Sequence, residues 1–339
     1  MGAALLFITT FIWGTAFLAQ KFGAGELGPF AMVALRNLLG GTFLATILLF
    51  RLLFKNERLR SQESEGRGRP VFRGGRLQEL LGRNRGALLF GALAGVPLFF
   101  AMFAQQQGIE YTSPGISAFL TTNYIFFVPI AEFLLFRKRH PAFVWLGVLL
   151  AILGTYLICL PTGTGTSVPA SGTEVPAPFI GPGEAWTILC AILFAAQMMV
   201  IDRTIKGCDV LVFSTVQIFT CGLLAVPFMF LPSEANKLAA ANWQTAALAI
   251  IYCGVFSSGI AYTLQVAAQK RTPVAVAGII MSMESVFGAL SGYLILHDHM
   301  TTGQFFGCTL VFIAALGTQL FNSRTSKSPK VSKDPKNPK

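Results

Sequence analysis

The chain has 339 residues, of which 53% are hydrophobic and only 12% are charged, and its formal net charge is +11. Soluble domains normally carry about 25% charged residues, so this composition excludes an ordinary soluble domain. A charge of this size in a soluble protein would suggest a nucleic-acid partner. Here the basic residues occupy the breaks between long apolar runs, and we expect no nucleic acid.

Ten apolar runs each approach the ~20 residues that a helix needs to cross a bilayer. In chain order they are residues 2–19, 29–50, 86–106, 114–136, 142–160, 183–201, 211–231, 246–265, 273–296 and 302–321. Runs separated by short polar breaks are typical of membrane helices. The sequence therefore predicts an all-α polytopic membrane protein with ten transmembrane helices.

The first half of the chain opens with a run that contains WGTAF at residues 13–17. This run lacks a basic start and a clear cleavage site, so we expect a retained span and not a removed signal peptide. The second run carries Arg36 and Asn37. The polar stretch 56–82 follows, and its composition predicts a mobile cytoplasmic loop.

The fourth run holds Asn123 and Tyr124 and stops at the basic residues 137–140. After the fifth run, residues 162–182 are rich in Gly, Thr, Ser and Pro and contain no Lys or Arg, which indicates an extracytoplasmic linker. The second half then repeats the rhythm of the first: a shift of 160 residues places Thr112 on Thr272.

Each half holds five spans, so the second copy must be inserted upside down relative to the first, as in many secondary transporters. We therefore predict two inverted five-helix repeats. Their expected bounds are residues 1–161, with the cytoplasmic loop 56–82, and residues 183–322, joined by the linker 162–182 and followed by a basic disordered cytoplasmic tail at 323–339.

The basic residues fix the expected orientation. With the N-terminus inside and ten spans, inward segments hold 23 Lys or Arg, outward segments hold two, and Arg36 lies inside a span. Cytoplasmic loops carry an excess of Lys and Arg. We therefore expect a multi-pass protein of the cell (inner) membrane with both termini in the cytoplasm.

Motifs of common enzymes are missing from the sequence. It has no Walker A pattern, no HExxH, no GxSxG and no CxxC pair among its six cysteines. His297 and His299 are two residues apart and would not share a helical face. We expect no cofactor and no metal site.

Glu284 lies in the middle of the ninth run, where a carboxylate costs roughly 3 kcal/mol on insertion scales. It fits a gate, a proton carrier or a contact for a substrate amine. It equally fits a structural carboxylate bonded to hydroxyls near it in sequence. Arg36 cannot shed its charge, so it must meet an anion, carbonyl groups or water, either as a partner of a substrate carboxylate or paired with a helix carboxylate.

Neutral polar and aromatic residues inside the runs add further candidates. Amides such as Gln197 and Gln217 either join helices by hydrogen bonds or line a polar cavity, and aromatic rings either stack on a substrate or pack between helices. The candidates for substrate binding or coupling are Arg36, Glu284, Trp13, Asn123, Tyr124, Gln197 and Gln217.

Four stretches together resemble the drug/metabolite transporter superfamily, in its EamA-like branch. They are WGTAF (13–17), GPFAMVALRN (28–37), QGIEYTSPGISAFLTTNYIFFVPI (107–130) and MESVFGAL (283–290). The resemblance covers about residues 4–321 and puts Arg36 and Glu284 at positions where the family has an arginine and a glutamate. It implies a central substrate cavity between the two halves.

We therefore expect a secondary transporter of small organic metabolites, such as amino acids or related solutes, that works by alternating access. Its expected partners are the small-molecule substrate and the lipid bilayer, with a homodimer left open. Two alternatives remain: a polytopic membrane enzyme acting on lipid-linked groups, and a channel. Ionisable residues gathered at one membrane face would favour the enzyme, and an enclosed central cavity would favour the carrier.

Overall fold

The structure is a computed structural model that describes residues 2–63, 82, 84–112, 114–158, 181–295 and 301–327. Every regular element within these ranges is helical. Nine helical stretches there are long and apolar enough to cross a membrane, and Ala142–Ile158 is a shorter apolar helix of 17 residues. The chain is thus an all-α polytopic membrane protein, and the tenth span stays a prediction.

The first half contains α1 (Gly2–Glu26), α2 (Pro29–Glu63), α4 (Arg85–Tyr111), α5 (Pro114–Thr122), α6 (Tyr124–Phe136) and α7 (Ala142–Ile158). The second half contains α8 (Pro182–Thr204), α9 (Val210–Ala225), η1 (Val226–Phe230), α10 (Pro232–Ala240), α11 (Trp243–Ile251), η2 (Tyr252–Ala261), α12 (Tyr262–Gln269), α13 (Val274–Met281), α14 (Met283–Ile295) and α15 (Thr302–Lys327). In lipid, backbone polar groups must be bonded within the segment, which is why apolar runs of this length form helices.

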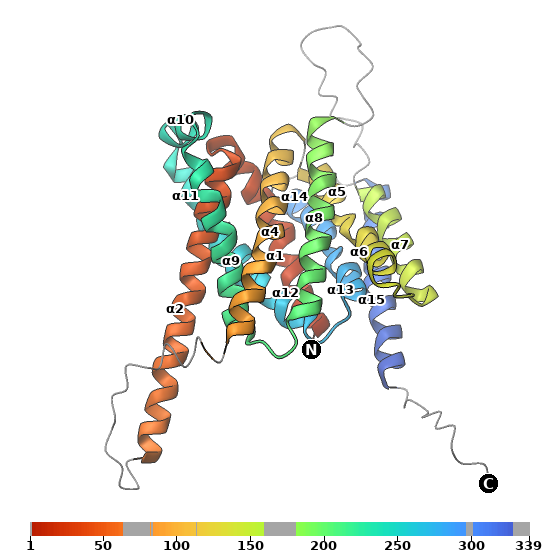
Figure 1. Cartoon of the computed structure of the whole chain (residues 1–339). Helices are drawn as coiled ribbons and strands as arrows, with labels where there is room; N and C mark the ends of the chain where they lie inside the picture. Colours follow the sequence, from red (N-terminus) through yellow and green to blue (C-terminus); the bar gives the residue numbers. More distant parts are fainter. Residues whose placement is uncertain are drawn as a thin grey trace, which may run out of the picture.

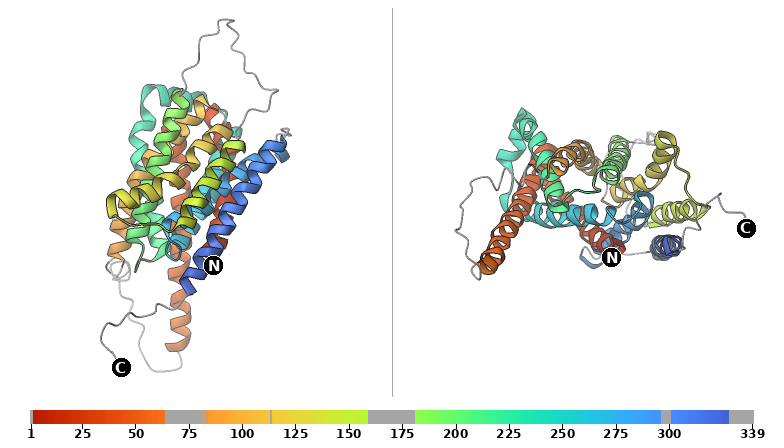
Figure 2. Two further views of the ribbon diagram at one scale, coloured as in Figure 1. Left: turned by 90° about the vertical axis from the view of Figure 1, so that its right-hand side faces the viewer. Right: turned by 60° about the horizontal axis from the view of Figure 1, so that its bottom comes forward.

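The helices form one bundle whose two ends differ (Figure 1). We call the end that holds Gly2, Arg85 and Lys270 the N-side, and the end that holds Glu26, Tyr111 and Pro182 the far side. Figures 1 and 2 show α2 at one edge of the bundle and α7 with α15 at the opposite edge. Most of the predicted loop 56–82, nearly all of the linker 162–182 and most of the tail 323–339 lie outside the described residues.

The two halves interleave in a pattern that repeats between them. Helix α1 packs on η2, α12 and α14, while α8 packs on α4, α5 and α6, the corresponding elements of the other half. Helix α2 packs on α9, and α7 packs on α15, so corresponding helices also pair with each other. Neither half therefore forms a core without the other.

Two spans are interrupted at points that the 160-residue shift places one residue apart. Asn123 separates α5 from α6 and Ser282 separates α13 from α14, each nine residues after a proline, Pro114 and Pro273. Side chains satisfy the backbone at each break: Asn123 Nδ2 donates to the Phe119 and Leu120 carbonyls at 3.2 Å, and Ser282 Oγ donates to the Ile279 carbonyl at 2.7 Å. Discontinuous helices near the midplane are a feature of secondary transporters.

Glycines bring helices close together at the centre of the bundle. A Cβ atom at Gly14 of α1 would lie 2.7 Å from the Glu284 carbonyl oxygen and 2.8 Å from the Gly288 nitrogen. At the edge, a Cβ atom at Gly154 of α7 would lie 2.7 Å from the Gly307 carbonyl oxygen of α15. Only a residue without a side chain permits these approaches, a common means of packing helices in membranes.

Candidate functional site

A cavity lies among the helices of both halves. Its polar lining comprises Gln20, Arg36, Gln105, Thr121, Gln197, Ser257, Gln265 and Glu284. Its aromatic and apolar lining comprises Trp13, Phe17, Tyr124, Phe194, Met198, Tyr262 and Met281. All of these side chains except Trp13 are buried.

Arg36 reaches the cavity from α2 and is held on η2. Its Nε donates to Ser258 Oγ at 3.3 Å, and its Nη2 donates to Ser257 Oγ at 3.2 Å. Both serines lie in η2, a π-helical segment, and such segments frequently occur at functional sites. The remaining nitrogen, Nη1, is buried without a hydrogen-bond partner, and no carboxylate of the described residues lies within ion-pair distance of Arg36.

Glu284 lies in the first turn of α14, directly after the break at Ser282. Its Oε1 accepts hydrogen bonds from the Tyr124 hydroxyl at 3.0 Å and from Thr122 Oγ1 at 3.3 Å. These two residues flank the break at Asn123, so the two interrupted spans meet at this carboxylate. The serine hydroxyls of its own helix bond backbone carbonyls instead.

Amide side chains extend the cavity toward both ends of the bundle. Gln20 and Gln105 lie in the far-side portions of α1 and α4, and Gln197 and Gln265 lie toward the N-side on α8 and α12. Gln265 Nε2 donates to Gln197 Oε1 at 3.4 Å, while Gln20 Oε1, Gln197 Nε2 and Gln265 Oε1 are buried without a partner. Unpaired buried amides of this kind cost about 1–3 kcal/mol each unless a polar ligand or water meets them.

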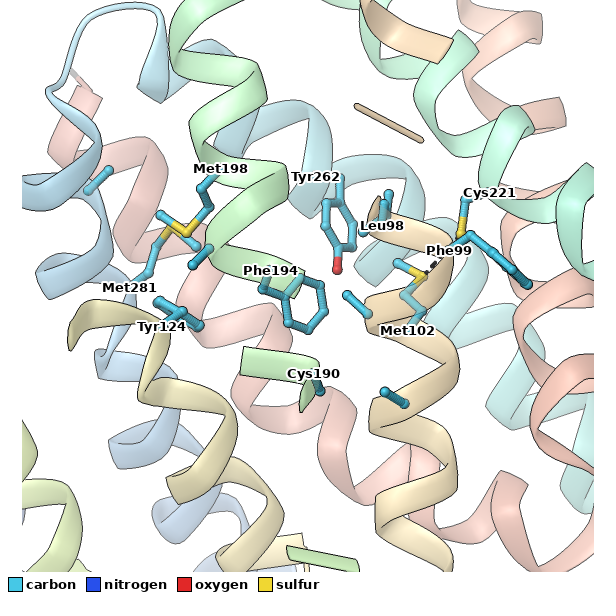
Figure 3. Close-up of a cluster of buried hydrophobic side chains, with 14 of the residues drawn as sticks. Leu98, Phe99, Met102, Tyr124, Cys190, Phe194, Met198, Cys221, Tyr262 and Met281 are labelled. Carbon is cyan, nitrogen blue, oxygen red and sulfur yellow. Dashed lines mark hydrogen bonds between the residues drawn. The ribbon is translucent and has the colours of Figure 1, made fainter. Parts of the chain in front are cut away.

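The apolar wall is formed by aromatic rings and methionines. The Trp13 and Tyr262 rings have their centroids 4.8 Å apart, and Trp13 Nε1 donates to the Ser257 carbonyl at 3.4 Å. Figure 3 shows the Met198 side chain of α8 and the Met281 side chain of α13 pointing toward one another, and the Tyr262 hydroxyl pointing toward Phe194. The wall can therefore enclose the apolar part of a small solute.

The cavity brings together five of the seven residues predicted from the sequence: Arg36, Glu284, Trp13, Tyr124 and Gln197. Asn123 is not among its lining residues, because its side-chain amide donates hydrogen bonds to the carbonyls at the helix break. Gln217 lies on α9, fully buried and outside the cavity lining, with both amide atoms unpaired. A role in substrate contact stays a prediction for all seven.

The sequence candidates omitted several lining residues, among them Gln20, Gln105, Tyr262 and Gln265. One signal was available for two of them: the 160-residue shift that relates the halves places Gln105 on Gln265. Ser257 and Ser258 carry no such signal, since two serines in an apolar span are ordinary and the π-helical turn that presents them cannot be read from hydropathy.

The described residues contain no group of three or more His, Cys, Asp or Glu side chains placed to hold a metal ion. His297 and His299 lie outside them. The cavity is lined by one cationic side chain with an unpaired N–H group, Arg36, and by one carboxylate, Glu284. Both are buried away from bulk water, and amides and aromatic rings make up much of the remaining lining. Such a site is suited to a small molecule that carries both charges.

Comparisons with known proteins agree with this geometry. Residues 1–160 and 181–319 match the profile of the EamA-like transporter family. The chain is 22% identical over 311 residues to an uncharacterized transporter of Archaeoglobus fulgidus, covering 92% of this chain and 83% of that protein. It is 27% identical over 244 residues to the threonine/homoserine exporter RhtA of Escherichia coli strain K12, covering 66% of this chain and 76% of the exporter.

The fold has also been seen before. A protein crystal structure superposes with a TM-score of 0.67 and 17% sequence identity, covering 96% of this chain and 99% of the other.

Proposed function

The chain belongs to the EamA-like transporter family of the drug/metabolite transporter superfamily, and we propose that it carries small zwitterionic metabolites, amino acids or close relatives of them, by alternating access around the central cavity. As a member of a transporter family it is a membrane permease and not an enzyme. The proposal concerns the solute, the mechanism and the orientation in the membrane.

The observation that carries the proposal is the pair Arg36 and Glu284, which line one cavity without pairing with each other. A guanidinium presents planar N–H groups that match a carboxylate. A buried carboxylate that already accepts two hydroxyl hydrogen bonds retains lone pairs for an ammonium group. In the proposed pose, the carboxylate of an α-amino acid bonds Arg36 and its ammonium group bonds Glu284.

A relative supports the same class of solute. The name of the E. coli protein RhtA states that it exports threonine and homoserine, which are both zwitterions with a short side chain. The two charged groups in the cavity give a physical reason for extending this class to the present chain.

Alternating access follows from the internal repeat. Corresponding elements of the inverted halves surround the cavity, and the interrupted spans meet at Glu284. In such proteins the halves rock about a fixed midplane site. We place the N-side in the cytoplasm of a cell (inner) membrane, because cytoplasmic segments collect Lys and Arg.

The test is an uptake and counterflow panel in proteoliposomes, with and without a pH gradient. We expect uptake of neutral amino acids, competition by compounds that carry both charges, and loss of competition by analogues that lack either the carboxylate or the amine. Glu284→Gln, inserted at wild-type levels, should lose uptake because the ammonium partner is gone.

Normal uptake by Glu284→Gln, or equal competition by single-charge analogues, would contradict the zwitterion proposal. Ion conductance above the turnover of a carrier would establish a channel instead.

A further inference from the structure

Two groups of three residues, each with one member that lines the cavity, occupy corresponding positions in the two halves. At the far side Phe17, Ile109 and Ala118 form a buried apolar cluster. The 160-residue shift carries Ile109 onto Gln269 and Ala118 onto Gly278. Both of these residues meet Met198, which lines the cavity on α8, as described next.

The N-side group is connected through Met198. The methyl carbon of Met198 would lie 3.8 Å from a Cβ atom at Gly278, and Gln269 Nε2 donates to the Met198 carbonyl at 3.4 Å. Met198 also corresponds to Phe17, because α1 and α8 are the first helices of the two halves. Helix α1 lines the cavity with Trp13, Phe17 and Gln20, and α8 lines it with Phe194, Gln197 and Met198. In both helices two of the three residues form a pair four positions apart, Trp13 with Phe17 and Phe194 with Met198.

The two helices run in opposite directions, which places the second member of each pair at opposite ends. Helix α1 runs from the N-side to the far side, so Phe17 lies beyond Trp13 toward the far side. Helix α8 runs the other way, so Met198 lies beyond Phe194 toward the N-side. Figure 3 shows Met198 and Phe194 on successive turns of α8.

We propose that Phe17, Ile109 and Ala118 are the far-side gate of the transport path, that Met198, Gln269 and Gly278 are its N-side gate, and that the N-side gate opens more readily. This rests on the proposed alternating-access function. It assigns a role in transport to residues that do not hold the charged groups of the solute.

The difference between the gates lies in their side chains. The far-side group has an aromatic ring packed on two apolar side chains, with exposed fractions of 3%, 0% and 4%. Opening it would expose these three apolar side chains to water. The far-side gate therefore resists opening by the hydrophobic effect.

The N-side group is equally buried but less apolar. Glycine contributes no side chain, methionine is flexible and adapts its shape, and Gln269 Oε1 is buried without a partner. Entry of water on this side would hydrate that oxygen and relieve a desolvation cost. The empty protein should therefore expose its cavity to the N-side more often than to the far side.

The experiment measures labelling of introduced cysteines by a membrane-impermeant thiol reagent added to one side of sealed vesicles, read by mass spectrometry on the peptide that carries the substitution. The side is assigned from amine labelling of Lys206 and Lys237 in the same vesicles. Phe17→Cys should react only from the far side and Met198→Cys only from the N-side.

The N-side rate should exceed the far-side rate by about tenfold or more, the factor that corresponds to about 1.4 kcal/mol. Ala16→Cys and Ala195→Cys are matched controls, because both are buried neighbours on α1 and α8 that do not line the cavity. They should stay unreactive from both sides. Reaction of both gate positions from the same side, or controls as reactive as the gates, would overturn the assignment.

A second pair of variants keeps the test valid if Phe17→Cys or Met198→Cys fails to fold. Ala118→Cys and Gln269→Cys probe the same two groups at smaller or already polar positions and should repeat the pattern of sides. A faster rate at Ala118→Cys than at Gln269→Cys would overturn the order of opening.

The N-side gate can also be given the composition of the far-side gate. In Met198→Phe/Gln269→Ile/Gly278→Ala, the new Cβ at Gly278 meets its nearest neighbours at 3.7 and 3.8 Å, which is ordinary contact. We expect N-side labelling of a reporter, Gln265→Cys, to fall about tenfold in this background, and an unchanged rate would overturn the proposal.

All of these measurements are made without substrate, so a wrong solute class would leave the labelling pattern intact.

Discussion

At the scale of single residues, the molecule is organised by two buried charges that come from different halves. Arg36 has no counterpart of its own kind in the second half. Glu284 has none in the first, where the 160-residue shift places it on Tyr124. Each charge is stabilised by hydroxyl groups that arrive from the other half. Arg36 and Glu284 therefore connect the two halves as well as lining the cavity.

Arg36 should not be replaceable by lysine. The three N–H donors of a lysine ammonium all lie on one nitrogen. Lysine therefore cannot reproduce the planar fork in which Nε bonds Ser258, Nη2 bonds Ser257 and Nη1 is left for the cavity. We expect Arg36→Lys and Arg36→Ala each to lower transport kcat/KM at least about tenfold, a loss of about 1.4 kcal/mol, in proteoliposome uptake.

Arg51→Lys is the matched control, since Arg51 makes an exposed ion pair with Asp209, and pairs of that kind contribute about 0–1 kcal/mol. Full activity of Arg36→Lys would show that charge alone suffices.

Tyr124 is expected to position Glu284. Tyr124→Phe keeps the ring and removes only the hydroxyl that donates to Glu284 Oε1 at 3.0 Å. A hydrogen bond to a charged group is worth about 1.5–3 kcal/mol, so substrate KM should rise about tenfold or more while the amount of inserted protein is unchanged. Tyr156→Phe, on the exposed face of α7, should leave KM unaltered, and equal behaviour of the two variants would refute the positioning role.

At the scale of elements, hydropathy predicted where spans lie but not their internal breaks. The run 114–136 is apolar throughout, so nothing in its hydropathy distinguishes one helix from α5 and α6 meeting at Asn123. The same holds for Ser282 and for the π-helical turns of η2. Asn123 was expected to contact substrate because a polar side chain in a span suggests a cavity. Its position at a helix break is a tertiary feature that no local pattern shows.

Gly14 should tolerate no side chain. In Gly14→Ala the new Cβ would meet backbone atoms of Glu284 and Gly288 at 2.7 and 2.8 Å, and backbone cannot yield as a flexible side chain can. Overpacking of this kind costs about 1–3 kcal/mol. We expect a lower Tm in detergent and loss of transport, because α14 and its carboxylate are displaced. Gly25→Ala on the same helix, where nothing lies within 4 Å, is the control and should keep both.

Helix α10 supplies a pH-dependent contact outside the spans. Glu234 Oε2 accepts from the Ala31 nitrogen at 3.0 Å in the first turn of α2, and burial raises the pKa of this carboxyl above its ordinary value of 4.5. A carboxyl whose pKa is raised by folding binds its proton more tightly in the folded state than in the unfolded state. Lowering the pH from above the folded-state pKa towards the ordinary value of 4.5 therefore stabilises the fold.

We therefore expect the Tm of the wild type, relative to Glu234→Gln, to rise between pH 7 and pH 5, measured by thermal unfolding in detergent. A constant difference between the two proteins over that range would contradict the assignment.

At the scale of the whole molecule, the inverted repeat was readable from the parity of the spans and from the 160-residue shift, and the structure shows corresponding helices packed together. The composition of the cavity was less readable. Five candidate residues line it, yet Gln217 does not. The rotation of a helix about its own axis decides which neighbouring element a given side chain faces. That rotation is set by packing over long sequence distances, such as Gly95 against the Gln217 backbone.

The proposed orientation can be checked on the unmodified protein. An impermeant amine reagent added to intact cells should label Lys237, which lies on the far side, and should reach Lys206 and Lys270 on the N-side only after permeabilisation. The positive-inside distribution is the reason for this expectation. Labelling of Lys206 in sealed cells would reverse the assignment of both faces.

The hydroxyl partners of Arg36 bear on how the protein is made. Ser257 lies 221 residues after Arg36, and ribosomes add about 5–20 residues per second. Roughly 11–44 s therefore pass during which the nascent second helix holds a charge in the bilayer without its eventual partners. Insertion must shelter this arginine, through the translocation machinery or a lipid phosphate, until η2 has been synthesised. A stalled or truncated first half would be a natural target for membrane quality control.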